Sequence, residues 1–178
     1  MGGQNITYLK GPSEGGNLPV SPIDERPEGS VPFVLLSIAG ETFAVEISKV
    51  REIIRVPHMT WVPGTQDYVR GVINLRGNVV AVIDLAKMLG MPRAEEDSQT
   101  RIMIVESSGV MAGVLVDSVS RVADIAPSQL EPSLRTLDED QRAFVVAQMN
   151  LDDKLIGILE LDEILAQARA AKAPNQNG

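Results

Sequence analysis

The sequence contains an internal repeat, and this repeat limits the folds open to the chain more than any single motif does. Residues 80–90 align with residues 156–166 at an offset of 76 positions: the large apolar side chains coincide, and Asp84 meets Glu160. A second alignment, at an offset of 69, brings together Gly40 and Gly109, Val45 and Val114, Ile47 and Val116, Val50 and Val119, and Ile53 and Val122. Both matches occur in the same order along the chain. The sequence therefore indicates two related units, 32–90 and 100–166, joined by a linker at 91–99.

Strand patterns dominate both units. Apolar runs at 33–38 and 43–47, 71–75 and 79–83, 102–105 and 111–116, and 144–151 and 155–161 each flank a short turn, which is typical of β-hairpins. Helical spacing of Ile47, Val50, Ile53 and Ile54 after Ser48 predicts a short helix that ends before Pro57, and a second helix is predicted at 162–171. Units this small are marginal alone. We therefore predict a mostly β fold of two five-stranded barrels packed together, with a groove where they meet.

The two ends of the 178-residue chain differ from this folded part, 32–166. Residues 1–31 are rich in Gly, Pro, Ser and Asn without periodicity, which predicts a flexible tail, and 167–178 read as a helix end followed by a frayed C-terminus. The N-terminus has no basic segment followed by an apolar one, as a secretory signal would. Charged and polar residues interrupt the most apolar region, so no segment suits a bilayer, and we expect a cytoplasmic protein without direct membrane insertion.

Composition excludes several kinds of chemistry. The chain has no Cys and a single His, His58, so we expect no disulfide, no metal and no cofactor. A net charge of −8 and only 3% aromatic residues argue against nucleic acid, because phosphates require cationic surfaces and bases require stacking rings.

Two carboxylates have alternative interpretations. Asp84 and Glu160 occupy equivalent places in the repeat, and one interpretation makes them the acid and base of a small hydrolase. In the other, each accepts hydrogen bonds at the start of a short helix beginning one residue later, which the sequence favours. We therefore expect a protein without catalytic activity.

Charged residues near a hairpin turn suggest a binding surface. Arg76 lies in the turn of the hairpin at 71–83, and Glu52, Arg55 and Arg70 lie near it if the predicted helix after Ser48 packs beside that hairpin. An apolar patch with charged edges is typical of a protein–protein interface. The apolar members, Val50, Ile53 and Ile54, have a second interpretation as ordinary barrel core, and composition leaves both open.

Several motifs resemble the CheW family, the adaptors of bacterial chemosensory arrays. The resemblance rests on Val50-Arg-Glu-Ile-Ile-Arg-Val-Pro57, Trp61-Val-Pro63, Tyr68-Val-Arg-Gly-Val-Ile-Asn-Leu-Arg-Gly77, Val82-Ile-Asp-Leu85 and Gly113-Val-Leu-Val-Asp-Ser-Val119. It implies two SH3-like barrels and a non-catalytic adaptor that couples the tips of methyl-accepting receptors to the regulatory domain of a CheA-type histidine kinase. It also implies recruitment to membrane receptor arrays and a monomer when isolated.

The resemblance also implies roles for individual residues. Val50, Glu52, Ile53, Arg76 and Ile102 fall at positions associated with receptor contact, whereas Gly71, Gly77 and Gly113 fall at backbone positions that the barrels need. Kinase-facing residues are not assigned. We expect Arg76→Ala to weaken receptor binding and to leave the fold intact. The alternatives are an adaptor of a pathway with a non-flagellar output and, less favoured, the hydrolase that uses Asp84 and Glu160.

Overall fold

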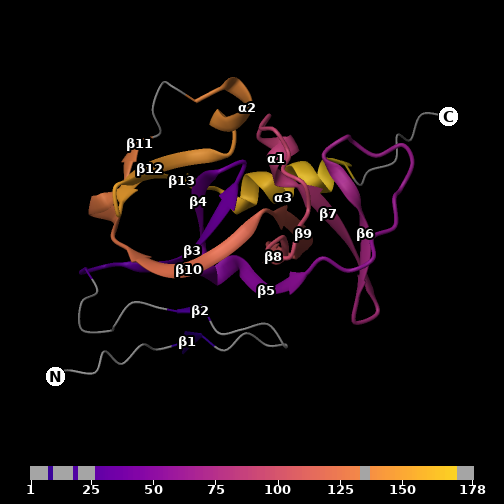
Figure 1. Ribbon diagram of the computed structural model, residues 1–178, viewed down its shortest axis with the longest axis horizontal. Coiled ribbons are helices and arrows are strands. Elements are labelled where there is room, and N and C mark those ends of the chain that lie inside the picture. Colours follow the sequence, from indigo (N-terminus) through magenta and orange to yellow (C-terminus); the bar gives the residue numbers. More distant parts are fainter. Residues whose placement is uncertain (1–7, 10–17, 20–26, 133–136, 172–178) are drawn as a thin grey trace.

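The computed structural model describes residues 8–9, 18–19, 27–132 and 137–171 (Figure 1). The strands are β1 (Tyr8–Leu9), β2 (Leu18–Pro19), β3 (Val31–Ile38), β4 (Glu41–Glu46), β5 (Val50–Arg55), β6 (Val69–Leu75), β7 (Asn78–Asp84), β8 (Arg101–Ser107), β9 (Val110–Val116), β10 (Ser118–Ile125), β11 (Glu131–Pro132), β12 (Val145–Leu151) and β13 (Lys154–Leu159). The α-helices are α1 (Leu85–Met88), α2 (Glu139–Arg142) and α3 (Leu161–Ala171), and two 3-10 turns are η2 (Ile47–Lys49) and η3 (Pro127–Gln129).

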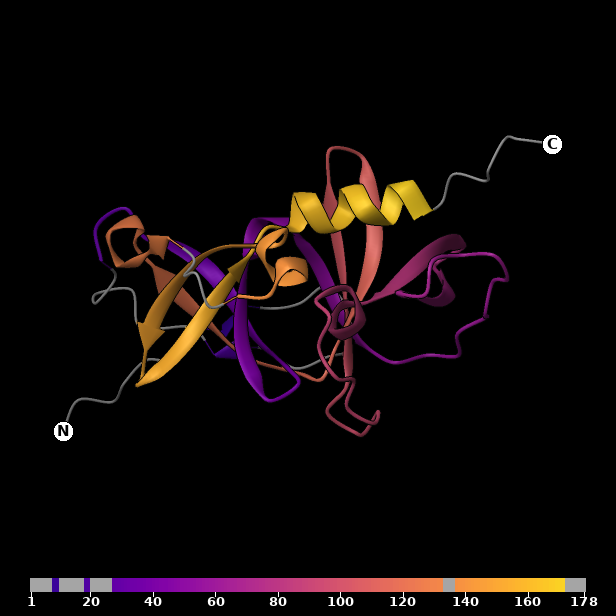
Figure 2. The same cartoon turned by 90° about the horizontal axis from the view of Figure 1, so that it is seen from above.

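Two curved sheets lie side by side along the long axis of the molecule (Figures 1 and 2). Sheet I has the strand order β10-β3-β4-β13-β12-β11, and sheet II has the order β5-β8-β9-β7-β6. Each sheet curls around its own apolar cluster, with Phe33 and Met149 in sheet I and Ile73 and Leu115 in sheet II. The predicted mostly β architecture of two barrels with few helices and a C-terminal helix is confirmed.

The sheets do not divide the chain as the repeat does. Sheet I combines β3 and β4 from the first repeat with β10, β12 and β13 from the second, whereas sheet II spans residues 50–116 without a break. The third strand of each repeat is exchanged: β5 pairs with β8, and β10 pairs with β3. A boundary at 91–99 therefore separates the repeats but not the sheets, because strand pairing leaves no signal in a hydropathy pattern.

The segment at 47–54 is not the predicted helix. After the single turn of η2 the chain forms β5, which has a β-bulge between Val50 and Glu52. A bulge adds one residue to a strand and so shifts the alternation of its side chains. Val50 and Ile53 consequently face the same way at a spacing of three, which imitates a helical pattern. The strand β10 repeats this feature, with a bulge between Val119 and Arg121, and its strand character was not predicted either.

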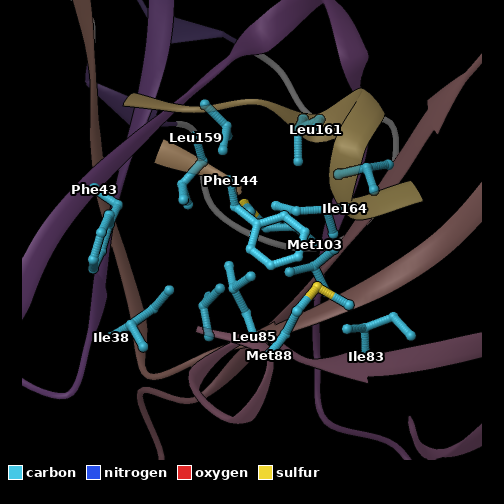
Figure 3. Close-up of a cluster of buried hydrophobic side chains, with 14 of the residues drawn as sticks. Ile38, Phe43, Ile83, Leu85, Met88, Met103, Phe144, Leu159, Leu161 and Ile164 are labelled. Atoms are coloured by element: carbon cyan, nitrogen blue, oxygen red, sulfur yellow. The ribbon is translucent and has the colours of Figure 1, made fainter. Parts of the chain in front are cut away.

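A third and larger apolar cluster lies between the two sheets. Figure 3 shows Phe43 and Leu159 of sheet I meeting Met103 of sheet II, with Leu85 from α1 and Ile164 from α3. Of these side chains, Leu85, Met103 and Ile164 have no exposed surface. Because burial of apolar surface stabilises by about 25 cal/mol per Å², this shared cluster holds the two sheets in one arrangement.

The two ends of the chain differ in how far the structure tests the predictions made for them. The predicted C-terminal helix is confirmed as α3, whose first turn carries Asp162 and Glu163. Within the predicted tail, β1 and β2 form a short antiparallel pair, and β2 contacts β10. The rest of the expectation for residues 1–26, and the frayed end at 172–178, lie outside the described residues.

Candidate functional site

An ion pair between Glu52 and Arg76 is the centre of the candidate site. Arg76 Nη1 and Nη2 donate to Glu52 Oε1 and Oε2 at 2.9 and 2.8 Å, so the contact is bidentate. The Glu52 side chain is 4% exposed, whereas that of Arg76 is 60% exposed. The predicted proximity of these two residues is present in the structure, and it places a buried carboxylate under a cation that faces solvent.

The bulge in β5 explains why a carboxylate is buried here. It turns Glu52 toward the interior of sheet II, where Ile54 packs on the apolar cluster. Val50 and Ile53 face the other way and lie half-buried against the cluster between the sheets. Both interpretations of the apolar members therefore apply: Ile54 belongs to the barrel interior, and Val50 and Ile53 form a partly exposed edge beside the ion pair.

Arg76 is held by its turn. It has φ +49° and Gly77 has φ +86°, so both residues of the turn between β6 and β7 are left-handed, as a type I′ hairpin requires. The Gly77 amide donates to Asn74 Oδ1 at 2.9 Å. A short, hydrogen-bonded turn fixes the direction of the arginine, which reaches across to β5 on the opposite edge of sheet II.

Other residues expected in this group lie elsewhere. Arg70 pairs with Glu96 of the linker at 3.4 Å, and Arg55 is exposed at the end of β5. Ile102 has no exposed surface and belongs to the cluster inside sheet II. It lies on the inward face of β8 without exposed surface, so its burial supports a packing role beneath the site, and the receptor contact expected at Ile102 stays a prediction.

Two glycines allow close packing around this half of the molecule. A Cβ added to Gly71, whose φ is +151°, would lie 2.6 Å from the Thr60 carbonyl oxygen, which itself bonds the Val72 amide. A Cβ on Gly113 would lie 2.8 Å from the Ile102 side chain. By contrast, a Cβ added to Gly77 would meet open space, so this position favours glycine only because of its positive φ of +86°.

The carboxylates of the alternative hydrolase are both engaged at helix starts. Asp84 Oδ1 accepts from the Lys87 amide at 3.2 Å, and Asp84 Oδ2 lies 3.3 Å from Arg93. Glu160 Oε1 accepts from the Asp162 amide at 3.2 Å and from Lys49 Nζ at 2.9 Å. The capping interpretation accounts for both residues, and each carries a cationic partner in addition, so the hydrolase is not favoured.

A network that the sequence analysis missed joins the repeats near β5. Lys49 Nζ lies 2.9 Å from both Glu160 and Asp162, which ties the end of η2 to the start of α3. Hydrogen bonds from the Ser107 side chain and from Lys49 lower the pKa of Asp162 below its ordinary value of 3.8. Burial opposes the charge on Lys49, but hydrogen bonds to Asp162 and Glu160 outweigh it and raise the pKa of Lys49. The repeat offers no signal for this network, because Ala86 and Ser118 occupy the positions equivalent to Asp162 and Lys49.

Across residues 27–132 and 137–171 no group of three His, Asp or Glu side chains is placed to hold a metal ion. Among the helices that the structure describes, none combines the length and apolar character needed to cross a bilayer.

Comparison with known proteins identifies the family. The sequence model for the CheW-like domain matches residues 32–169. The chain belongs to the CheW-like family. The chain is 32% identical over 142 residues to the chemotaxis protein CheW of Helicobacter pylori, covering 79% of this chain and 85% of that protein. It is 29% identical to the CheW of Bacillus subtilis, covering 81% and 93%.

A solved structure extends this family assignment to the fold. The scaffolding protein TtCheW from Thermoanaerobacter tengcongensis superposes with a TM-score of 0.67 and 35% sequence identity, covering 74% of this chain and 89% of that one. The resemblance to the CheW family drawn from the motifs is thus confirmed. The relatives that these comparisons name are chemotaxis proteins and, in the case of TtCheW, a scaffolding protein.

Proposed function

We propose that this CheW-like protein couples the cytoplasmic tip of a methyl-accepting chemoreceptor to the regulatory domain of a CheA-type histidine kinase, within arrays at the cytoplasmic face of the membrane. The observation that carries the proposal is the buried Glu52 under the exposed Arg76, beside Val50 and Ile53. The chemotaxis names of the relatives favour this role over a pathway with a non-flagellar output.

The chemistry of this site suits a helical partner. Val50 and Ile53 are half-buried, so each keeps apolar surface that a partner can cover. Helices that dock on protein surfaces bring apolar anchors at regular spacing, and charged groups at the edge fix their register. Val50 and Ile53 offer such an edge on β5, and Arg76 stands at its border.

Arg76 is suited to read a carboxylate or carbonyl group of the receptor tip. A guanidinium carries five N–H donors, and the pair with Glu52 occupies one face of it through Nη1 and Nη2. The remaining donors lie on the part of the side chain that faces solvent. Since Glu52 is buried, it orients Arg76 without competing for the outer face, which prepares the cation before the partner arrives.

The test is a binding titration of a chemoreceptor signalling-tip fragment and, separately, of a CheA regulatory domain. The variant is Glu52→Gln with Arg76→Gln, which removes both charges but keeps two amides able to hydrogen-bond. We expect receptor binding to weaken by about tenfold or more, with binding of the kinase domain retained. The matched control is Lys87→Gln with Asp67→Asn, an exposed pair 3.8 Å apart at the end of the β6–β7 hairpin opposite its turn.

The outcomes separate clearly. Loss of receptor binding in the site variant, with the control behaving as wild type, supports the proposal. Wild-type protein that binds neither fragment, or a site variant that binds the receptor tip as wild type does, overturns it. Circular dichroism and thermal melting of each variant exclude unfolding as the cause of any loss.

A further inference from the structure

The repeat places a second ion pair in sheet I at the position equivalent to Glu52–Arg76. Arg121 is the repeat equivalent of Glu52 at the 69-residue offset, and Asp152 is the repeat equivalent of Arg76 at the 76-residue offset. Both strands have their bulge at the same place, and the turn residues Arg76 and Asp152 have φ of +49° and +50°. Arg121 Nη2 donates to Asp152 Oδ2 at 2.6 Å. The backbone is the same, but the charges have changed places: here the strand carries the cation and the turn carries the anion.

This second pair borders a hollow of about 400 Å³ in sheet I. Its floor is apolar, since Leu35, Leu36 and Ile156 are nearly fully buried. Its walls carry hydroxyl groups from Ser37, Thr42, Ser118 and Ser120. Lys154, next to the turn, adds a second cation to the lining. A concave surface with an apolar floor and a few polar groups is typical of a binding site.

We propose that this hollow is a second contact site of the adaptor, which binds a carboxylate side chain on a helical segment of the partner that docks at Glu52–Arg76. The inference rests on the function proposed above and names a further part of the surface that the partner uses. Arg121 and Lys154 supply the positive charge, and the serine and threonine hydroxyl groups supply hydrogen bonds.

Charge argues for an acidic ligand. Two cations and one anion line the hollow, in a chain whose net charge is −8. Surface cations in an acidic protein attract a carboxylate through favourable local charge, an attraction that salt weakens. The resident partner, Asp152, is 75% exposed and solvated, so its contact with Arg121 is readily exchanged for a partner's carboxylate. The guanidinium also has donors beyond the one that reaches Asp152.

Position argues for the same partner. In Figure 1 the two bulged strands, β10 and β5, follow one another along the lower edge of the two sheets, opposite α2, and β2 lies against β10. Val119 on β10 packs on the cluster between the sheets and remains half-buried, as Val50 and Ile53 on β5 do. Half-buried apolar residues on both strands, together with two ion pairs of opposite charge order, support one elongated partner as the occupant of both sites.

The test uses a double charge reversal, Arg121→Glu with Asp152→Lys, in the full chain. This variant can keep an ion pair between strand and turn, so a purely structural role of the pair would leave binding unchanged. We expect the affinity for a chemoreceptor signalling-tip fragment to fall by about tenfold at low ionic strength, with a smaller difference at high ionic strength. A second variant, Lys154→Gln, is expected to weaken binding by about twofold to threefold.

The controls distinguish the two proposals. The reversal of Lys87 and Asp67, Lys87→Asp with Asp67→Lys, changes exposed charges by the same amount and should bind as wild type. Loss of binding in the Glu52/Arg76 variant, together with wild-type affinity in the Arg121/Asp152 reversal and in Lys154→Gln, overturns the second site and leaves the proposed function standing. Wild-type protein that does not bind the fragment at all overturns both. Loss in the reversal alone, with melting temperature retained, supports the second site and contradicts the role given to Arg76.

Discussion

The two sheets are built on one backbone plan but differ in what each ion pair exposes. In sheet II the strand contributes a buried carboxylate, Glu52, and the turn an exposed arginine, Arg76. In sheet I the strand contributes Arg121 with 34% of its side chain exposed, and the turn contributes the more exposed Asp152. The position of a charged residue is thus inherited from the repeat, whereas burial decides whether its ion pair supports the fold. The pair in sheet II supports the fold through the buried Glu52 and also presents the exposed Arg76 to solvent. The pair in sheet I lies at the surface, with a half-buried arginine and an exposed aspartate.

A second difference concerns the loops that cover the outer strands. Gly71 on β6 and Ala147 on β12 are equivalent in the repeat, and both follow a bulge. The segment at Thr60 crosses so close to Gly71 that no Cβ fits, whereas β11 pairs with β12 through Pro132 opposite Ala147. The two sheets therefore differ at the same place: Gly71 has φ +151° and no room for a Cβ, whereas Ala147 carries a Cβ without a positive φ.

The largest expected effect comes from exchanging these two residues. Gly71→Ala should lower the free energy of unfolding by about 3 kcal/mol, because the new Cβ collides with the Thr60 carbonyl and φ is unfavourable for alanine. Ala147→Gly should cost only about 0.5–1 kcal/mol from added backbone freedom. Urea denaturation of both variants measures the difference. Equal losses would show that the two covering segments are equally constrained.

The next effect separates the two ion pairs by stability. Arg76→Ala should lower the free energy of unfolding by about 2 kcal/mol, because it leaves the buried Glu52 carboxylate without its bidentate partner. Arg121→Ala should cost under about 0.5 kcal/mol, since Asp152 stays solvated. The loss expected for Arg76→Ala lowers stability without unfolding the protein, so the expectation that this variant keeps its fold stays a prediction.

Chemical denaturation at neutral pH measures both ion-pair variants. Adding Glu52→Gln to Arg76→Ala should restore part of the loss, because a neutral amide costs less to bury than a carboxylate. Equal sensitivity of the two sheets to arginine removal would contradict the role assigned to burial.

The smallest effect depends on pH and concerns Asp162 in α3. The equivalent position of the first repeat, in α1, is Ala86. Because the pKa of Asp162 is lowered in the folded state, its contribution to stability is present above 3.8 and disappears as pH falls through the folded value. Asp162→Asn should therefore lower the free energy of unfolding at neutral pH by under about 1 kcal/mol. The melting temperature should fall slightly as a result. The two proteins should converge in acid, as thermal melts between acidic and neutral pH would show. A difference that grows on acidification would contradict this assignment.

The sequence allowed the hairpins to be predicted because each has a local signal: apolar alternation on both sides of a turn with left-handed residues. It did not allow β5 to be predicted, because the bulge at Arg51 spaces Val50 and Ile53 as a helix would. The proximity of Glu52 and Arg76 was expected from a helix packed beside the hairpin, whereas the structure brings the two residues together through the bulged strand β5. The place of Ile102 could not be predicted, since inward and outward positions on β8 are both apolar.

The second ion pair was within reach of the sequence. The two offsets that revealed the repeat also carry Glu52 to Arg121 and Arg76 to Asp152, so the pair follows once the first site is known. Strand exchange was not within reach, because the choice between β3 and β8 as a neighbour for β5 depends on contacts between residues far apart in the chain. The same limit applies to Lys49, whose partners are more than 100 positions away.

The exchange of β5 and β10 bears on how such a chain arose. A polypeptide of one repeat length would have to pair its third strand with its own first strand, whereas in this chain the third strand of each repeat pairs with the first strand of the other. Two identical copies, each lending its third strand to the other, would satisfy both edges, as an interlocked dimer. Duplication of the gene and fusion of the copies would make that dimer permanent in a single chain. After fusion, a substitution in one repeat would no longer change both halves of the molecule. The charges of the two sheets could then change independently, which explains the reversed ion pairs.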